Sequence, residues 1–283
     1  MKQVLNLFKL RIGVAIAFAA AAGMAVESGS GPGATASLVL LLAVLVASAA
    51  AGAFNQYVER DLDARMDRTR NRPFVTGALR RGPAWLWLIG AMLAASVLAA
   101  AVAANALAAL YVFLGAFTYG VVYTVWLKRR TWWNIVVGGL AGSFAVLAGA
   151  AAVSPAPGPE ALALAVVLFL WTPPHFWSLA IAYREDYAAA QVPMLPVVVG
   201  DARAARAIFA SAALLVAASF VPAAFGLGWL YLACAAAGGI LFLLRCRTLV
   251  QRPGRDTARA AFLASLAQLG AVLAGAMLDA ALT

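Results

Sequence analysis

The chain has 283 residues, of which 65% are hydrophobic and only 11% are charged, and this balance excludes an ordinary soluble domain. The formal net charge of +10 would suit a nucleic-acid-binding protein, but the charges are confined to short segments between long apolar runs. The composition therefore indicates an integral membrane protein and argues against nucleic acid as a partner.

Apolar runs of 15 to 24 residues recur along the whole chain, and a helix needs roughly 20 apolar residues to cross a hydrocarbon core about 30 Å thick. Nine such runs lie near residues 10–26, 37–57, 84–104, 106–126, 133–153, 161–182, 206–226, 229–244 and 260–281. They predict an all-α integral membrane protein with nine transmembrane helices in a single domain, 1–283. Alanine dominates the runs, which favours close approach of the helices.

The distribution of cations predicts the orientation of these spans. If the N-terminus is cytoplasmic, all 21 Lys and Arg residues, from Lys2 in the N-terminal tail onward, fall on the cytoplasmic side. The positive-inside rule accounts for this asymmetry, so the basic residues are expected to face anionic membrane lipid. We therefore expect a protein of the cytoplasmic (inner) membrane whose active site faces the cytoplasm.

The second run ends in a stripe of oxygen-bearing side chains. Asn55, Glu59, Asp63 and Asp67 recur every four residues, so on a continuing helix they share one face. Such oxygens suit Mg²⁺, which takes one or two carboxylates and completes its shell with water and substrate phosphate. The alternative is a solvated helix end whose carboxylates pair with nearby arginines, namely Arg60, Arg65, Arg68, Arg70 and Arg72. Asn55 lies inside the apolar run, which favours the metal or ligand site.

The sixth run leads into a second polar segment, WTPPHFWSLAIAYREDYAAAQVPMLPVVVG at residues 171–200. Pro173 and Pro174 are expected to break this span near its middle. His175, the single histidine of the chain, follows directly; it is a candidate ligand-binding group, or it hydrogen-bonds a neighbouring helix. Glu185 and Asp186 form a second acidic cluster that could reach a metal opposite the first, unless they are ordinary loop charges.

A third cluster, YTVWLKRRTWWN at residues 123–134, follows the fourth run. Lys128, Arg129 and Arg130 are either topology anchors beside an aromatic belt or a site for the oxygens of a diphosphate, which lysine and arginine both suit.

Together these segments resemble the protoheme IX farnesyltransferases, or haem O synthases, of the UbiA superfamily of intramembrane prenyltransferases. The superfamily resemblance rests on the N-x-x-x-[DE]-x-x-x-D stripe followed by an arginine-rich loop. The haem-type resemblance rests on D-x-x-M-x-R-T at 63–69, P-H-F at 174–176, and E-D-Y with P-M-L-P within 185–196. Glu59 departs from the pattern, where aspartate is commoner.

The resemblance implies nine transmembrane helices around a central cavity, with Mg²⁺ holding an isoprenyl diphosphate between two acidic motifs. By position, the metal-binding and catalytic residues would be Asn55, Glu59, Asp63 and Asp186, with Asp67 and Glu185 as further candidates. The diphosphate partners would be Arg68, Arg72, Lys128 and Arg130. His175 would bind haem, and Tyr123 would be one of the aromatic residues near the allylic cation.

The implied reaction transfers a farnesyl group from farnesyl diphosphate to a vinyl carbon of haem b, with addition of water, and gives haem O and diphosphate. Its product could pass to the next enzyme of haem A synthesis. Two alternatives remain open at this point. One is a related prenyltransferase that acts on an aromatic acid such as 4-hydroxybenzoate. The other is a transporter, in which intramembrane charge lines a substrate path.

Overall fold

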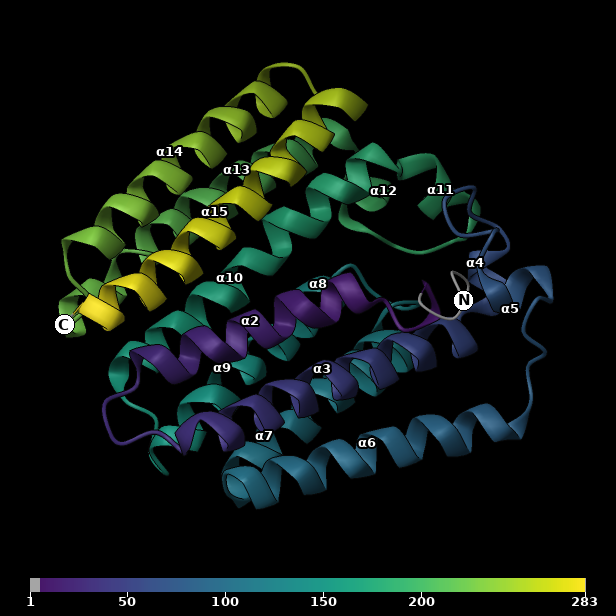
Figure 1. Cartoon of the computed structure of the whole chain (residues 1–283). Coiled ribbons are helices and arrows are strands. Elements are labelled where there is room, and N and C mark those ends of the chain that lie inside the picture. The colour runs from purple at the N-terminus through teal and green to yellow at the C-terminus, as the bar shows by residue number, and fades with distance from the viewer. Residues whose placement is uncertain (1–5, 283) are drawn as a thin grey trace.

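The computed structural model describes residues 6–282, and every regular element in that range is helical (Figure 1). The predicted all-α architecture is confirmed. In chain order, the elements are α2 (Leu10–Val26), α3 (Gly33–Val58), α4 (Arg60–Asp63), α5 (Pro73–Thr76), α6 (Pro83–Ala103), α7 (Ala106–Phe117), η1 (Thr118–Leu127), α8 (Asn134–Gly138), α9 (Leu140–Val153), α10 (Pro159–Ala182), α11 (Arg184–Ala189), α12 (Leu195–Val199), α13 (Asp201–Ala218), η2 (Val221–Phe225), α14 (Trp229–Gln251) and α15 (Arg255–Leu282).

The long helices of this set have the length of membrane spans. Among the described residues, eight helical segments are long and apolar enough to cross a membrane, and α2 is a shorter apolar helix of 17 residues. The eight segments and α2 coincide with the nine predicted runs. The chain is therefore an integral membrane protein, while the count of nine spans and the cytoplasmic N-terminus stay predictions.

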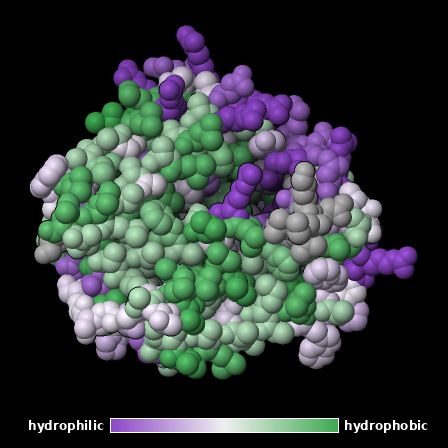
Figure 2. Space-filling view, viewed as in Figure 1, coloured by the Kyte–Doolittle hydropathy of each residue, from purple (hydrophilic) through white to green (hydrophobic). Residues whose placement is uncertain are grey.

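The polar segments gather at one end of the bundle. Figure 1 shows α4, α5 and α11 at one end of the bundle, whereas α15 ends at the opposite end. Hydrophilic residues cover the same region and the turn between α14 and α15, while apolar residues cover much of the remaining visible face (Figure 2). Lys2, one of the cations used to predict the orientation, lies outside the described residues.

Helices α2 and α9 cross with their backbones in close contact. A Cβ atom added to Gly23 would lie 2.1 Å from the carbonyl oxygen of Val146, and one added to Gly149 would lie 1.8 Å from that of Ala20. Glycine inside a helix costs about 1 kcal/mol relative to alanine, so close backbone contact explains why glycine occupies both positions. The predicted close approach of small-residue helices is confirmed at this crossing.

The fourth span changes its winding at the polar end. After α7 the chain continues as the π-helix η1 over Thr118–Leu127, and the backbone N–H of Lys128 still bonds to Tyr123 five residues back, at 2.9 Å. Stretches of π-helix are rare and occur frequently at functional sites. This π-helix packs against α3 and α8.

The sixth span is continuous, and the predicted break at its centre is wrong. Pro173 and Pro174 both lie inside the uninterrupted helix α10. The helix passes through them because α9, α13 and α15 pack along it, and transmembrane helices tolerate proline where neighbouring groups compensate the lost backbone bonds. One turn beyond the prolines, the hydroxyl of Ser178 donates to the Pro174 carbonyl at 2.7 Å.

Candidate active site

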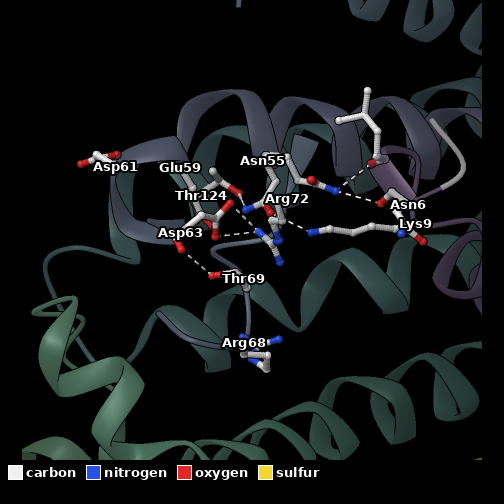
Figure 3. A network of polar contacts seen from close by, with 12 residues as sticks. Asn6, Lys9, Asn55, Glu59, Asp61, Asp63, Arg68, Thr69, Arg72 and Thr124 are labelled. Atoms are coloured by element: carbon white, nitrogen blue, oxygen red, sulfur yellow. Dashed lines mark hydrogen bonds and ion pairs between the residues drawn. The ribbon is translucent and has the colours of Figure 1, made fainter. Parts of the chain in front are cut away.

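Three members of the predicted acidic stripe share one buried face. Asn55 lies in the last turn of α3, Glu59 forms the junction, and Asp63 ends α4. Helical spacing persists across the junction, because Glu59 N–H bonds to the Asn55 carbonyl at 2.9 Å and Asp63 N–H bonds to that of Glu59 at 2.8 Å. The three residues are only 2%, 0% and 2% exposed, and Figure 3 shows their side chains together.

The fourth member of the stripe is not part of this cluster. The chain turns after α4, and the side chain of Asp67 is 80% exposed and paired with Arg70 at 3.1 Å. The turn is fixed by the Thr69 hydroxyl, which donates to the Asp63 carbonyl at 3.1 Å. The expectation that Asp67 continues the stripe is therefore wrong, since it assumed a helix that ends four residues earlier.

Each of the three buried side chains of the stripe faces a cation. Figure 3 shows two of these contacts, Lys9 with Asn55 and Arg72 with Asp63. The Lys128 ammonium donates to Glu59 Oε2 at 2.5 Å. The Arg72 guanidinium donates to both carboxylate oxygens of Asp63 at 2.7 Å. The Lys9 ammonium donates to Asn55 Oδ1 at 2.7 Å. Two carboxylates thus stand against three basic side chains, which leaves a surplus of positive charge suited to an anion.

These pairs also bear on the solvated-helix alternative. Of the five arginines considered, Arg70 forms an exposed pair with Asp67, as that alternative expects. Arg72 pairs with Asp63, but it reaches across nine residues and this pair is largely buried. Burial raises the pKa of Asp63, and Arg72 opposes that shift. An exposed helix end has no such desolvated pair, so the structure favours a built polar site.

The amide of Asn55 is oriented by a neighbouring hydroxyl. Thr124 donates its hydroxyl proton to the Tyr119 carbonyl at 2.8 Å. A hydroxyl has one proton, so Thr124 accepts from the amide nitrogen of Asn55 at 3.1 Å. The amide oxygen must then point toward Lys9 and the cation side of the stripe.

Lys9 is the site residue that sequence reasoning missed. It adopts left-handed backbone geometry with φ of 47° just before α2, which brings its ammonium to 3.0 Å from the Tyr119 hydroxyl. Its aliphatic stem lies over Gly52, where an added Cβ would be 3.4 Å from the lysine Cδ. Burial and the nearby Arg72 lower the pKa of Lys9 to about 7. In the sequence Lys9 stands between Lys2 and Arg11 before an apolar run, where its charge indicates only topology.

The aromatic side chains of η1 lie alongside the cations. Tyr119 and Tyr123 stack with ring centres 5.6 Å apart. The Lys9 ammonium stands 5.6 Å from the ring centre of Tyr119, and the Lys128 ammonium stands 5.6 Å from that of Tyr123. The π-helix thus presents two ring faces to two ammonium groups beside the stripe.

Asp186, from the second acidic motif, hydrogen-bonds to the loop that follows the first acidic motif. Asp186 accepts hydrogen bonds from the backbone amides of Asp67 and Arg68, at 3.3 and 3.2 Å. The Arg68 guanidinium lies 5.2 Å from the ring centre of Tyr183, and Glu185 is exposed. Within residues 6–282, no three His, Cys, Asp or Glu side chains form a metal-binding group, so the two motifs are not joined in one preformed cluster.

The third cluster divides between the site and the surface. Lys128 is buried against Glu59, whereas Arg130 is exposed. Arg129 pairs with Asp61 at 2.7 Å in a largely exposed ion pair, and its hydrogen bonds lower the pKa of Asp61. The structure therefore brings Lys128, but not Arg130, to the acidic stripe.

A polar hollow of about 280 Å³ adjoins the cations. Its lining includes Lys9, Arg68 and Arg72, which come from the start of the chain and from the first loop. This basic lining is suited to phosphate oxygens.

His175 lies in the contact between α10 and α15. Its ring is stacked between Trp171, with ring centres 4.0 Å apart, and Phe262, at 4.4 Å. Its Nδ1 is 2.7 Å from the hydroxyl oxygen of Ser265. The residue is 5% exposed, so its orientation is fixed by packing on both faces and by one in-plane hydrogen bond.

The donor set of the stripe fits a hard divalent cation. It consists of one amide oxygen and two carboxylates, the ligand types that Mg²⁺ prefers. In the described part of the chain, Glu59 Oε1 is buried without a hydrogen-bond partner. Buried polar atoms normally have a partner, and a bound metal ion would supply one for this oxygen. The remaining positions in a Mg²⁺ shell would be filled by water and phosphate oxygens.

Comparison with known proteins identifies the family. The sequence model of the UbiA prenyltransferase family matches residues 16–267. The chain belongs to the UbiA prenyltransferase family. Family membership agrees with the resemblance carried by the three motifs, and it does not favour the transporter alternative.

Relatives within the UbiA family carry a narrower name. The chain is 56% identical over 279 residues to protoheme IX farnesyltransferase 2 of Paramagnetospirillum magneticum, covering 99% of this chain and 97% of the relative. It is 48% identical to protoheme IX farnesyltransferase 1 of the same organism, covering 78% of each. The predicted resemblance to this group is therefore confirmed.

Solved structures confirm the UbiA fold at lower sequence identity. A digeranylgeranylglyceryl phosphate synthase has a TM-score of 0.80 at 17% identity, covering 100% of this chain and 99% of that one. A UbiA homologue from Archaeoglobus fulgidus, bound to DMAPP and Mg²⁺, has a TM-score of 0.70 at 18% identity, covering 95% and 99%.

Proposed function

We propose that the protein is a protoheme IX farnesyltransferase, which transfers a farnesyl group from farnesyl diphosphate to a vinyl group of haem b and yields haem O and diphosphate. The observation that carries the proposal is the 56% identity, over nearly the whole of both chains, to a relative of that name. The buried stripe and its cations supply the chemistry that such a transfer needs.

The first step is heterolysis of the bond between farnesyl C1 and the diphosphate oxygen, which leaves with the electron pair. The negative charge that develops on the diphosphate needs cationic donors that are already in position. Lys9, Arg72 and Lys128 converge on the stripe from three separate segments. We assign them as diphosphate partners, with Arg68 beside the same hollow.

Bound Mg²⁺ would supply Lewis-acid neutralisation of the diphosphate oxygens. Asn55, Glu59 and Asp63 would hold it, and Asp186 stays a proposed ligand from the second motif. These oxygens now face Lys9, Lys128 and Arg72. The same basic side chains would bind phosphate oxygens when Asn55, Glu59 and Asp63 hold the metal ion.

The second step joins the allylic carbon to the vinyl group. The π electrons of the vinyl group form the new carbon–carbon bond, and water adds to the neighbouring carbon as a proton leaves. Tyr119 and Tyr123 present stacked ring faces beside the site, where they can stabilise the allylic cation while apolar helices exclude water until the bond has formed. His175 is assigned to the haem, as the group that binds or positions it.

The same proposal extends to location and partners. The concentration of cations at the end that carries the site supports a cytoplasm-facing active site in the inner membrane. The product would pass to the next enzyme of haem A synthesis.

The direct test is expression in membranes supplied with haem b, farnesyl diphosphate and Mg²⁺, followed by extraction and chromatography of the haems. We expect a more apolar haem that forms only when all three are present. A parallel reaction adds 4-hydroxybenzoate. An unchanged haem alongside a prenylated phenolic acid in that reaction would instead assign the protein to the aromatic-acid prenyltransferases.

A further inference from the structure

The ring of His175 is held by α15 as well as by its own helix. Phe262 covers one face of the imidazole and Trp171 covers the other, with interplanar angles of 27° and 22°. The stacked rings restrict rotation, so the two nitrogens can engage partners only in the plane of the ring. One of these in-plane partners is Ser265, whose Oγ lies 2.7 Å from Nδ1.

The direction of that hydrogen bond follows from counting protons. Ser265 Oγ lies 2.6 Å from the carbonyl oxygen of Phe262, to which it donates. A carbonyl oxygen can only accept, and a serine hydroxyl carries one proton. That proton is therefore committed to Phe262, and Ser265 must accept from Nδ1 of the histidine. Nδ1 then carries the hydrogen of the neutral ring, and Nε2 keeps a free electron pair.

Ser265 is itself fixed in place by α10. The indole N–H of Trp171 donates to the backbone carbonyl of Ser265 at 2.8 Å. The same indole stacks on His175, so one tryptophan sets both the ring plane and the position of the residue that bonds to Nδ1. Ser265 is fully buried, and water therefore does not compete for its hydroxyl.

We propose that Ser265 is a positioning residue that holds His175 as the Nδ1–H tautomer, so that the Nε2 electron pair is presented to the iron of the haem acceptor. The proposal rests on the proposed function for the identity of the acceptor. Outer hydrogen bonds that fix the tautomer of a histidine ligand typically change metal affinity by about 10- to 100-fold. The iron would meet a pre-oriented Lewis base, and the hydroxyl of Ser265 would never touch the substrate.

The tautomer can be measured without any substrate because the chain contains a single histidine. Protein carrying a histidine-free tag and ¹⁵N,¹³C-labelled histidine is reconstituted in lipid and studied by solid-state NMR near neutral pH. We expect a protonated Nδ1 and an unprotonated Nε2 in the wild type, and loss of this single form in Ser265→Ala. A wild-type ring protonated at Nε2, or an unchanged Ser265→Ala ring, overturns the proposal.

Ferric haem b titrated into the same proteins tests the consequence for iron. We expect the shift of the haem absorption band to require His175, Ser265→Ala to weaken haem binding by about 10- to 100-fold, and Ser265→Thr, which keeps a hydroxyl, to restore it. The matched control is Ser96→Ala, which removes a buried serine hydroxyl bonded at 2.8 Å to Met92 of its own helix. That control should bind haem as the wild type does.

Three outcomes of the titration count against the proposal. Equal haem spectra for wild type and His175→Ala overturn the ligand role of the histidine. Equal losses of haem affinity in Ser265→Ala and Ser96→Ala indicate only a general packing effect. A Ser265→Thr variant that binds haem as weakly as Ser265→Ala shows that the hydroxyl does not contribute. Failure of the proposed function is scored separately, as absence of a farnesylated haem from the wild-type enzyme.

Discussion

Replacing Lys128 with methionine should destabilise the protein far more than the same change at its neighbour, Arg129. Lys128 pairs with Glu59 at 2.5 Å, with side chains 11% and 1% exposed. Arg129 pairs with Asp61 at 2.7 Å, but those side chains are 41% and 53% exposed. Breaking a buried pair leaves an uncompensated charge and costs about 3–5 kcal/mol, whereas an exposed pair is worth about 0–1 kcal/mol.

The difference can be measured by thermal unfolding of the purified protein in detergent. Cys246 is fully buried on α14, whereas the other free cysteine, Cys234, is half-buried. In a Cys234→Ala background, a thiol-reactive fluorophore therefore reports the exposure of Cys246 on unfolding. For a chain of this size, a loss of 3–5 kcal/mol lowers the midpoint by on the order of 10 °C. We expect a shift of that size for Lys128→Met and a shift of at most about 3 °C for Arg129→Met. Because Glu59 Oε1 is also orphaned, added Mg²⁺ should raise the midpoint of Lys128→Met more than that of the wild type.

The double variant Lys128→Met with Glu59→Gln isolates the charge. Removing the carboxylate charge together with its partner should recover most of the loss, since a neutral amide is cheaper to bury. Equal midpoints for Lys128→Met and Arg129→Met, or no recovery in the double variant, would refute the buried pair as described.

Three further outcomes follow from the geometry. Asp63→Asn should lower kcat by at least about 100-fold in a farnesyl transfer assay, while Asp67→Asn should stay within about 2-fold; equal losses would restore Asp67 to the site. Lys9→Met should raise the KM for farnesyl diphosphate by about 10-fold, the value of a charged hydrogen bond, and an unchanged KM would remove Lys9 from the diphosphate site. Gly149→Ala should lower the free energy of unfolding by about 1–3 kcal/mol. Gly90→Ala, whose added Cβ meets nothing within 4 Å, should not lower it. Equal thermal unfolding midpoints for the two variants would contradict the close α2–α9 crossing.

The sequence was a reliable guide to the spans and to three members of the stripe. Apolar length alone located the long helices, because burial in lipid leaves little freedom in the pattern. The four-residue spacing placed Asn55, Glu59 and Asp63 on one face, since the helical hydrogen bonds persist across the junction. The same rule failed for Asp67 because the spacing carries no signal for where the helix ends.

The remaining features depend on tertiary contacts that have no local signature. Lys9 joins the site through a left-handed backbone residue and a glycine on another helix. The π-helix that presents Tyr119 and Tyr123 was not visible in a run that reads as an ordinary apolar span. The double proline predicted a break, yet packing by three neighbouring helices keeps α10 continuous.

The measurement that tests the central claim most directly is the mass of the haem product made by the purified protein in lipid nanodiscs. With haem b, farnesyl diphosphate and Mg²⁺, we expect haem b to gain one farnesyl group and one hydroxyl group, and we expect Asp63→Asn to yield none of this product. Haem recovered unchanged from the folded wild-type protein, or the same product formed at full rate by Asp63→Asn, would contradict the account.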